Sequence, residues 1–348
     1  MTVTSAIRNF VRRPGVFTTA PSYLDFASGF VIPPITPASP PVTAHGKQLH
    51  VYDVPIWKGQ WYPGPEESPR LIKDTGIFDS SLRFYDSYSH STFIPGDNWS
   101  IYKQLKMAKK YISDHMGDSV NPTHLVLGGD RSTSIATVAS MMHHYENDGA
   151  TGVIWLGAHA DLNCDDSSWT KNVNGMTAGI LAGFGRHRNI LFPFLGESNR
   201  ITANKMVYIG LRMFDSAEIQ RIDSLGIRYY GAAATKKDPI DIAREAVAYL
   251  YNNGCKRVHV SFDLSLLDAK YAGCTSTKNW SWLVHSTSDP PGLTLNEALK
   301  VANTIAFNRD ILPIVSADVV ELNPHLGNQE ELANTLQCTK EIIAELIY

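Results

Sequence analysis

The 348-residue sequence lacks long hydrophobic runs, a strong charge of one sign and paired cysteine motifs. No run of about 18 apolar residues is present, which excludes a membrane-spanning helix. The net charge is -3 and basic residues are scattered, which excludes the basic patch typical of nucleic-acid binding. The four cysteines show no CxxC spacing, and no secretory hydrophobic segment is present. We therefore expect a reduced compartment, the cytoplasm.

Residues 1–45 differ in composition from the rest of the chain. Arg8, Arg12 and Arg13 precede any acidic residue, and five prolines follow between residues 33 and 41. The prolines predict a stiff, non-helical arm lying on the fold, and a mitochondrial presequence is the alternative for the basic start. Residues 46–348 are predicted to form a single α/β domain, since the hydrophobic fraction of 43% can supply one large core.

Short apolar segments alternate with segments of helical length after residue 46. The predicted strands are 49–55, 124–127, 152–156, 206–210, 228–230, 257–262 and 311–316. The predicted helices are 98–116, 132–145, 216–225, 238–251, 294–306 and 329–347. Such alternation predicts a largely parallel sheet with helices on both faces, in which ligands bind beyond the carboxyl ends of the strands.

Polar residues follow three of the predicted strands. The strand 152–156 leads into Gly157, His159 and Asp161, spaced as in the metal-binding pattern Asp-x-His-x-Asp, with glycine in place of the first carboxylate. Alternation would place these three positions on one side of the strand edge. The other two strands lead into Asp130-Arg131 and into Asp263-Leu264-Ser265.

These motifs resemble those of the ureohydrolase family, and within it most closely the arginases. Residues 128–132 resemble the family's Gly-Gly-Asp-His-Ser motif, and residues 261–265 resemble Ser-Phe-Asp-x-Asp. Residues 207–212 resemble the middle of an arginase, and residues 318–324 resemble its last site strand. The resemblance implies a three-layer fold with a mostly parallel sheet of about eight strands, and assembly as a trimer.

The resemblance also implies where a metal centre would lie. Members of this family hold two manganese ions on two histidines and four aspartates, and the ions activate a hydroxide that attacks the guanidinium carbon. His159, Asp161 and Asp263 match three of these ligands. The other three positions carry Arg131, Gly157 and Ser265. We therefore expect no binuclear manganese cluster and no metal cofactor.

Arg131 is predicted to take the place of the first metal ion. Asp161 and Asp263 would be costly to bury without a counter-charge, and a guanidinium can satisfy one or both through bidentate hydrogen bonds. A fixed cation at this place would also repel an incoming divalent ion.

The remaining family positions separate into lost and retained ones. Asn174 stands at the position of the proton-shuttle histidine and cannot transfer protons near neutral pH. Glu321 matches the carboxylate that orients the guanidinium. Five further positions match those that hold the substrate's α-amino and α-carboxylate groups: Asn163, Ser168, Thr170, Asp215 and Glu218.

Each retained position has a structural alternative. Ser168 and Thr170 lie in a polar loop where hydroxyls are common for turn formation. Asp215 and Glu218 have the spacing of ordinary helix capping. Glu321 could merely brace a strand end. The loop 273–291 is longer than its family counterpart and either covers the site or is an insertion without a role.

These observations predict an arginase-like protein without arginine hydrolysis. Its remaining role would be to bind a small amino-acid-like ligand with a neutral or acidic side chain, or to regulate a partner as a homotrimer or with an active relative. The alternative is an active ureohydrolase, of the arginase or agmatinase type, that uses a single manganese ion on His159, Asp161 and Asp263.

Overall fold

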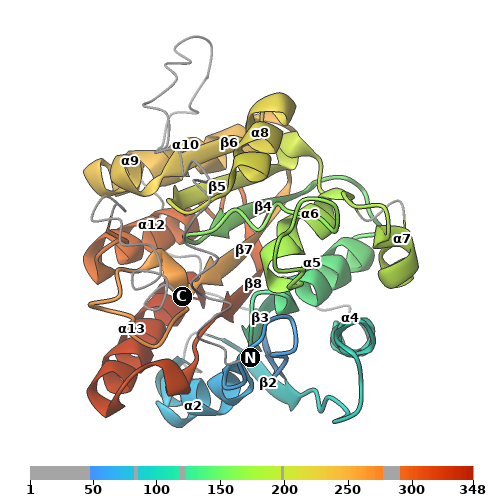
Figure 1. The fold of residues 1–348 in the computed structure, drawn as a ribbon. Helices are drawn as coiled ribbons and strands as arrows, with labels where there is room; N and C mark the ends of the chain where they lie inside the picture. The colour runs from blue at the N-terminus through green and yellow to red at the C-terminus, as the bar shows by residue number, and fades with distance from the viewer. Residues whose placement is uncertain (1–47, 82–84, 118–121, 197–199, 277–290, 348) are drawn as a thin grey trace, which may run out of the picture.

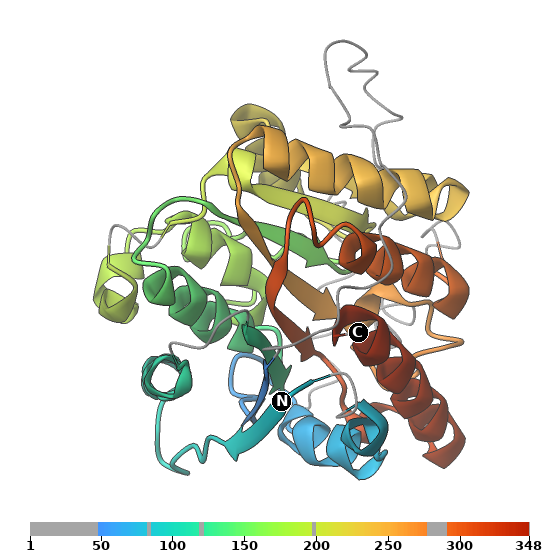
Figure 2. The same cartoon turned by 180° about the vertical axis from the view of Figure 1, so that it is seen from behind.

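The computed structural model describes residues 48–81, 85–117, 122–196, 200–276 and 291–347. In these residues eight strands form one sheet in the order β2-β1-β3-β8-β7-β4-β5-β6, and every neighbouring pair is parallel. Helices cover both faces of the sheet (Figure 1, Figure 2). The predicted three-layer α/β fold is confirmed. The predicted arm at 1–45 and most of the loop 273–291 lie outside the described residues.

Seven of the strands overlap predicted ones, although β8 begins three residues later and ends four residues later than the predicted strand 311–316. The strands are β1 (Gln48–Val54), β2 (Ser87–Thr92), β3 (Pro122–Gly128), β4 (Thr151–Leu156), β5 (Met206–Leu211), β6 (Arg228–Gly231), β7 (Arg257–Asp263) and β8 (Ile314–Val320). Strand β2 was not predicted, because its sequence SYSHST is polar and has none of the apolar side chains of a central strand. It lies at the edge of the sheet beside β1, where partial exposure tolerates such residues.

The six long predicted helices are present, and shorter ones occur between them. The helices are α2 (Ser68–Asp74), α3 (Ile77–Ser81), α4 (Ile101–His115), α5 (Thr133–His144), α6 (Thr177–Ala182), α7 (Arg188–Leu191), α8 (Ser216–Leu225), α9 (Ala232–Lys237), α10 (Pro239–Asn252), α12 (Leu295–Phe307) and α13 (Gln329–Ile347). The short helices have one or two turns, too few for a 3.6-residue pattern to be recognised. Among the described residues, no helix has the length and apolarity needed to cross a membrane.

The two faces of β7 differ in chemistry. Val258, Val260 and Phe262 belong to the larger apolar core, which they share with α10, α12 and α13. On the other face, His259 Nε2 lies 3.2 Å from Asp318 Oδ2 of β8, and Ser261 Oγ donates to Asp318 Oδ1 at 2.6 Å. These polar side chains are fully buried, and their mutual hydrogen bonds hold the central strands in register.

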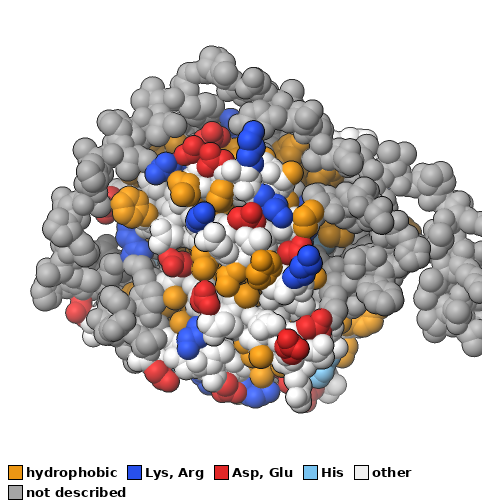
Figure 3. Space-filling view, turned by 90° about the vertical axis from the view of Figure 1, so that its left-hand side faces the viewer, with side chains coloured by type: hydrophobic (Ala, Val, Ile, Leu, Met, Phe, Trp, Pro, Cys, Tyr) orange, Lys and Arg blue, Asp and Glu red, His pale blue; other side chains and the backbone are white. Residues whose placement is uncertain are grey.

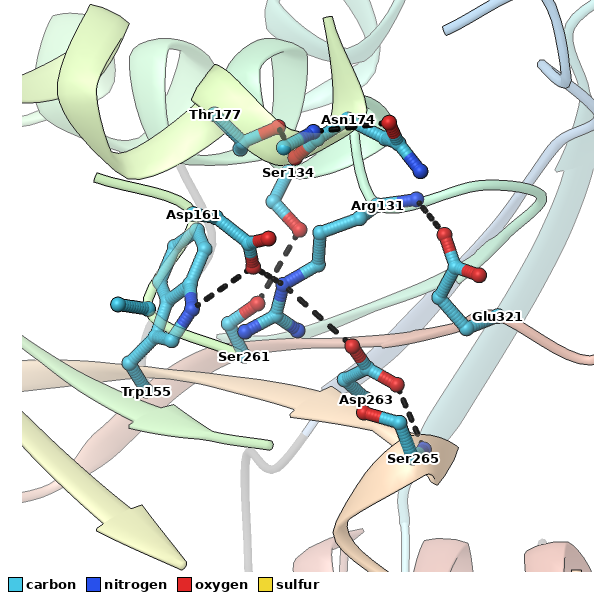
Figure 4. Close-up of polar contacts among 12 residues, drawn as sticks. Arg131, Ser134, Trp155, Asp161, Asn174, Thr177, Ser261, Asp263, Ser265 and Glu321 are labelled. Atoms are coloured by element: carbon cyan, nitrogen blue, oxygen red, sulfur yellow. Dashed lines mark hydrogen bonds and ion pairs between the residues drawn. The ribbon is translucent and has the colours of Figure 1, made fainter. Parts of the chain in front are cut away.

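The order of the central strands creates one polar edge. Strands β3, β8, β7 and β4 are consecutive neighbours, and all end at the same edge because they are parallel. Arg131 follows β3, Glu321 follows β8, Asp263 ends β7 and Gly157 follows β4. Residues separated by up to 190 positions in the sequence are therefore brought together (Figure 4).

Candidate functional site

Arg131 lies at the centre of this edge, with a side chain that is 2% exposed. Its Nε donates to Asp161 Oδ2 at 3.2 Å and lies 4.0 Å from Asp263 Oδ2. Its guanidinium carbon is 3.9 Å from the centre of the Trp155 ring, a cation–π contact (Figure 4). The structure thus places a fixed cation between the two carboxylates.

The two outer nitrogens of this guanidinium differ from Nε in their hydrogen bonding. Within the described part of the chain, Arg131 Nη1 and Nη2 are buried and have no hydrogen-bond partner. A β-carbon built on Gly157 would lie 3.6 Å from Nη2 and 3.2 Å from the β-carbon of Asp263. Nη2 therefore borders the position where the sequence has glycine in place of a carboxylate. A buried donor without a partner is unfavourable, and a hydrogen-bond acceptor at this place would remove the cost.

Asp161 is held from two sides. Trp155 Nε1 donates to the same Oδ2 atom at 3.4 Å, and the Asp161 backbone has a φ of 50°, which is unusual for a residue other than glycine. Burial raises the pKa of Asp161 to about 7, although Arg131 opposes this rise, and the nearby Asp263 adds to it. The sequence motifs did not predict a role for Trp155, although its spacing of two residues from Gly157 places both on one face of the strand.

Asp263 and Ser265 form a tight turn. Asp263 Oδ1 accepts a hydrogen bond from the Ser265 N–H at 2.6 Å, and Ser265 Oγ accepts one from the Ala158 N–H at 3.2 Å. The serine hydroxyl thus joins the end of β7 to the segment after β4.

His159 lies in that segment and makes an isolated bridge with Met213. Burial lowers the pKa of His159 to about 4, with Asp263 opposing and Arg212 reinforcing the shift. The imidazole is therefore neutral at physiological pH.

Glu321 closes the opposite side of the site. Its Oε1 accepts from the Arg131 backbone N–H at 2.7 Å, and its Oε2 lies 3.5 Å from Ser276 Oγ. Its backbone φ is 72°. Burial, followed by the charges of Asp263 and Asp130, raises the pKa of Glu321 well above its usual value. Glu321 thus does more than brace its strand, since it anchors the loop that carries Arg131.

Asp130 supports the same loop from behind. One of its oxygens accepts from the Gly59 N–H at 2.7 Å, and the other accepts from the Ser132 N–H at 2.8 Å. Burial raises the pKa of Asp130 to about 6. In the sequence, Asp130 was apparent only as part of the motif at residues 128–132.

The residues matched to the substrate's amino-acid group form a second network. Asn163 Nδ2 donates to Asp215 Oδ2 at 2.7 Å. Asp215 and Glu218 form a reciprocal capping box at the start of α8, and Glu218 Oε1 also accepts from the Leu162 N–H at 2.9 Å. Burial, followed by the charge of Asp215, raises the pKa of Glu218 to about 8. The capping alternative for Asp215 and Glu218 is therefore realised in the structure.

Ser168 and Thr170 lie in the loop before α6, and Asn174 begins the short 3-10 helix Asn174–Met176 that leads into α6. Ser168 Oγ accepts from the Lys171 N–H at 3.0 Å, and Thr170 Oγ1 accepts from the Asn172 N–H at 3.2 Å. Asn174 Oδ1 accepts from the Gly175 N–H at 2.8 Å. These contacts are ordinary turn interactions, so the three side chains shape the loop.

A family model and the similar curated proteins point to the same family. The Arginase family model matches residues 47–348. An arginase of Coccidioides immitis is 32% identical over 302 residues, covering 81% of this chain and 88% of that protein. Human arginase-1 is 27% identical over 313 residues, covering 85% of this chain and 91% of that protein.

Solved structures agree with this result. The crystal structure of arginase from Bacillus subtilis matches with a TM-score of 0.73 and 25% identity, covering 86% of this chain and 98% of that one. Formimidoylglutamase from Bacillus subtilis matches with a TM-score of 0.65 at 17% identity, covers 86% of each chain, and shows the fold alone. Because the family model covers all but the first 46 residues, this protein belongs to the arginase family.

Proposed function

We propose that this arginase-family protein neither holds a binuclear manganese centre nor hydrolyses arginine, and instead binds a small amino acid whose side chain ends in a carboxylate or a neutral polar group. The observation that supports this most directly is the buried Arg131 guanidinium with two unpaired nitrogens.

The donor atoms at this edge do not fit two manganese ions. Manganese prefers carboxylate and imidazole ligands, and Gly157 offers no side-chain atom at all. Ser265 Oγ is already bonded to the Ala158 N–H. The Arg131 guanidinium lies against Asp161 and near Asp263, the carboxylates that an ion would need. A dication would meet a fixed positive charge there, and its repulsion opposes metal binding.

The same guanidinium defines the ligand that would suit the site. Two parallel N–H donors match the two oxygens of a carboxylate, and a carbonyl oxygen can accept from one of them. The guanidinium of a bound arginine would instead meet a like charge. The network of Asn163, Asp215 and Glu218 supplies acidic and amide groups of the kind that hold an amino-acid backbone. Because Arg131 is almost fully buried, ligand entry requires local opening at this edge.

Isothermal titration calorimetry with glutamate, aspartate, glutamine, ornithine and arginine tests this proposal. We expect heat from the acidic or the neutral side chains, none from arginine, and loss of the signal in Arg131→Met. Arg131→Lys is the matched control, because lysine keeps the positive charge but lacks the two parallel N–H donors of the guanidinium. We expect this variant to bind more weakly than the wild type. No heat from any amino acid would overturn the ligand-binding proposal.

The single-metal hydrolase is the outcome that would contradict the first half of the proposal. Release of urea from arginine in the presence of manganese, abolished by Asp263→Ala, would show that hydrolysis persists on His159, Asp161 and Asp263.

A further inference from the structure

Three histidines gather at the amino edge of the sheet, opposite the Arg131 site. His50 lies in β1 and His124 lies beside it in β3, and the two are paired in register. Their ring centroids are 5.3 Å apart, and the ring of His144, the last residue of α5, is 6.0 Å from that of His124. Among the described residues these imidazoles form a cluster that the proposed amino-acid site does not use.

Two ring nitrogens in the cluster have no partner. His124 is 1% exposed, and its Nε2 and the Nε2 of His50 are buried without hydrogen bonds in the described part of the chain. Tyr52 can donate its hydroxyl proton to the His115 carbonyl at 3.3 Å, so its oxygen can accept from His124 Nδ1–H at 3.0 Å. In this arrangement Nε2 of His124 carries a free lone pair. A hydrogen bond that fixes the other ring nitrogen is typical of metal-binding histidines.

The spacing of the rings also agrees with shared coordination. Metal–nitrogen bonds of about 2.0–2.1 Å place each ring centroid about 3.2 Å from an ion, so tetrahedral ligands have centroids about 5.2 Å apart. The observed separations, 5.3 Å for His50–His124 and 6.0 Å for His124–His144, are close to this value. The rings of His50 and His124 are stacked with their planes 20° apart, so one of them must turn before both lone pairs meet at one ion. His50 and His144 are partly exposed, which gives an ion a path to the cluster.

A different group already has its ligand atoms within 4.8 Å of one another, namely Cys164, Asp165 and Asp166. However, Asp165 Oδ2 is paired with His187 Nδ1, Asp166 Oδ2 lies 3.2 Å from Arg186 Nε, and Cys164 Sγ accepts from Arg221, so among the buried ligand atoms of this group in the described part of the chain only Asp165 Oδ1 lacks a partner. The ligand atoms of the three imidazoles are further apart than those of this group, and the partly exposed His50 and His144 must rotate before the nitrogens converge on the buried His124.

We propose that His50, His124 and His144 bind one divalent transition-metal ion of the zinc class, such as Zn²⁺ or Cu²⁺. Three imidazoles and a water molecule complete a four-coordinate site for such an ion, which prefers nitrogen ligands more strongly than manganese does. The site is independent of Arg131, since it lies at the other end of the strands.

Zinc titration of the full chain by calorimetry tests this proposal, with His144→Ala as the variant. We expect one equivalent of Zn²⁺ in the wild type and at least tenfold weaker binding in His144→Ala. His143→Ala is the matched control, because His143 is the exposed neighbour on the same helical turn and should bind zinc like the wild type. Equal affinity in His144→Ala and His143→Ala would overturn the proposal.

Two further measurements distinguish the histidine cluster from other possible zinc sites. Asp263→Ala removes a carboxylate of the Arg131 site and should leave zinc affinity unchanged, whereas loss of binding in this variant would place the ion there. In wild-type protein loaded with Cu²⁺, electron paramagnetic resonance should show coupling to imidazole nitrogens that decreases in His50→Ala. An unchanged spectrum would contradict the assignment of His50 as a ligand.

Discussion

Arg131 determines the charge balance at the carboxyl edge of the sheet. Its guanidinium faces Asp161 and Asp263, while Asp130 and Glu321 lie on either side of its loop. One cation cannot balance four ionised carboxylates in a buried space. The raised pKa values of Asp161, Glu321 and Asp130 agree with this limit, because protonation reduces the negative charge.

Removal of the Arg131 cation should therefore destabilise the protein. Arg131→Met leaves Asp161 and Asp263 without their counter-charge, and we expect a loss of about 3–5 kcal/mol in the free energy of unfolding, measured with urea at pH 7. Arg131→Lys should lose less, because a charge remains. If Arg131→Met is as stable as the wild type, the salt-bridge network does not hold this edge together.

The pKa of Asp161 predicts a pH dependence with a defined sign. Its value of about 7 in the folded protein lies above the ordinary 3.8, so the folded state binds the proton more tightly than the unfolded state. The contribution of this group to stability is therefore present below about pH 4 and is lost as the pH rises through about 7. Asp161→Asn cannot ionise and should lose less stability than the wild type over this interval, as measured by thermal unfolding in a pH series. Parallel curves for the two proteins would contradict the shifted pKa.

At the scale of elements, helices α8 and α12 both begin with a capping box, but only that of α8 contacts a residue of the candidate ligand site. Asp215 and Glu218 form a capping box on α8, next to Asn163, and Thr294 and Glu297 form one on α12. The first helix start is thus linked to the candidate ligand site, and the second provides an internal comparison.

This pair gives a prediction with its own control. Asp215→Ala and Thr294→Ala should each reduce the free energy of unfolding by about 1 kcal/mol, because each removes a capping side chain. Calorimetry with the amino acid that binds should show weaker binding in Asp215→Ala alone. Equal ligand affinity in both variants would mean that Asp215 serves only as a cap.

The periodicity of apolar residues predicted the long helices and most strands, but it could not reveal a strand with a polar sequence. Seven strands followed from apolar segments, whereas β2 has a polar sequence and joins the sheet only because β1 offers a free edge. The helix α8 was predicted with its observed bounds, since its cap and the glycine after it mark both ends.

Only those residues of the candidate site that belong to family motifs could be predicted from the sequence. The resemblance identified Arg131, Asp161 and Asp263 as neighbours, although they are far apart in the sequence. It gave no sign of the Trp155 contact or of the unpaired Nη atoms, because these depend on side-chain packing. The histidine cluster was also missed. Only the strand order places His50 beside His124.

For the molecule as a whole, the sheet separates two chemically different edges. The carboxyl edge contains the Arg131 site, and the amino edge contains the three histidines. Acidic and basic side chains are intermixed on the side of the molecule shown in Figure 3. This mixed surface agrees with the small net charge of -3.

Because the chain has the fold of the arginase family, we expect that substitutions can restore manganese binding. The combined variant Arg131→His, Gly157→Asp and Ser265→Asp recreates six ligands on an unchanged backbone, and we expect it to retain manganese in elemental analysis. A small shift of Asp263 must accommodate the new β-carbon at Gly157, which would lie 3.2 Å from that of Asp263. The control is the double variant that keeps Arg131, which should retain no manganese because the guanidinium remains. Absence of manganese from the triple variant would show that these positions do not converge on a common site.

The central claim is that the Arg131 cation replaces the manganese ions. Its most direct test is elemental analysis of wild-type protein after incubation with excess manganese and desalting, with His144→Ala measured in parallel to exclude the histidine cluster. We predict less than about a tenth of an equivalent of manganese in both proteins, because the guanidinium repels a dication and three donor positions lack metal ligands. One or more equivalents retained by both proteins would contradict the account and restore a metal-dependent hydrolase.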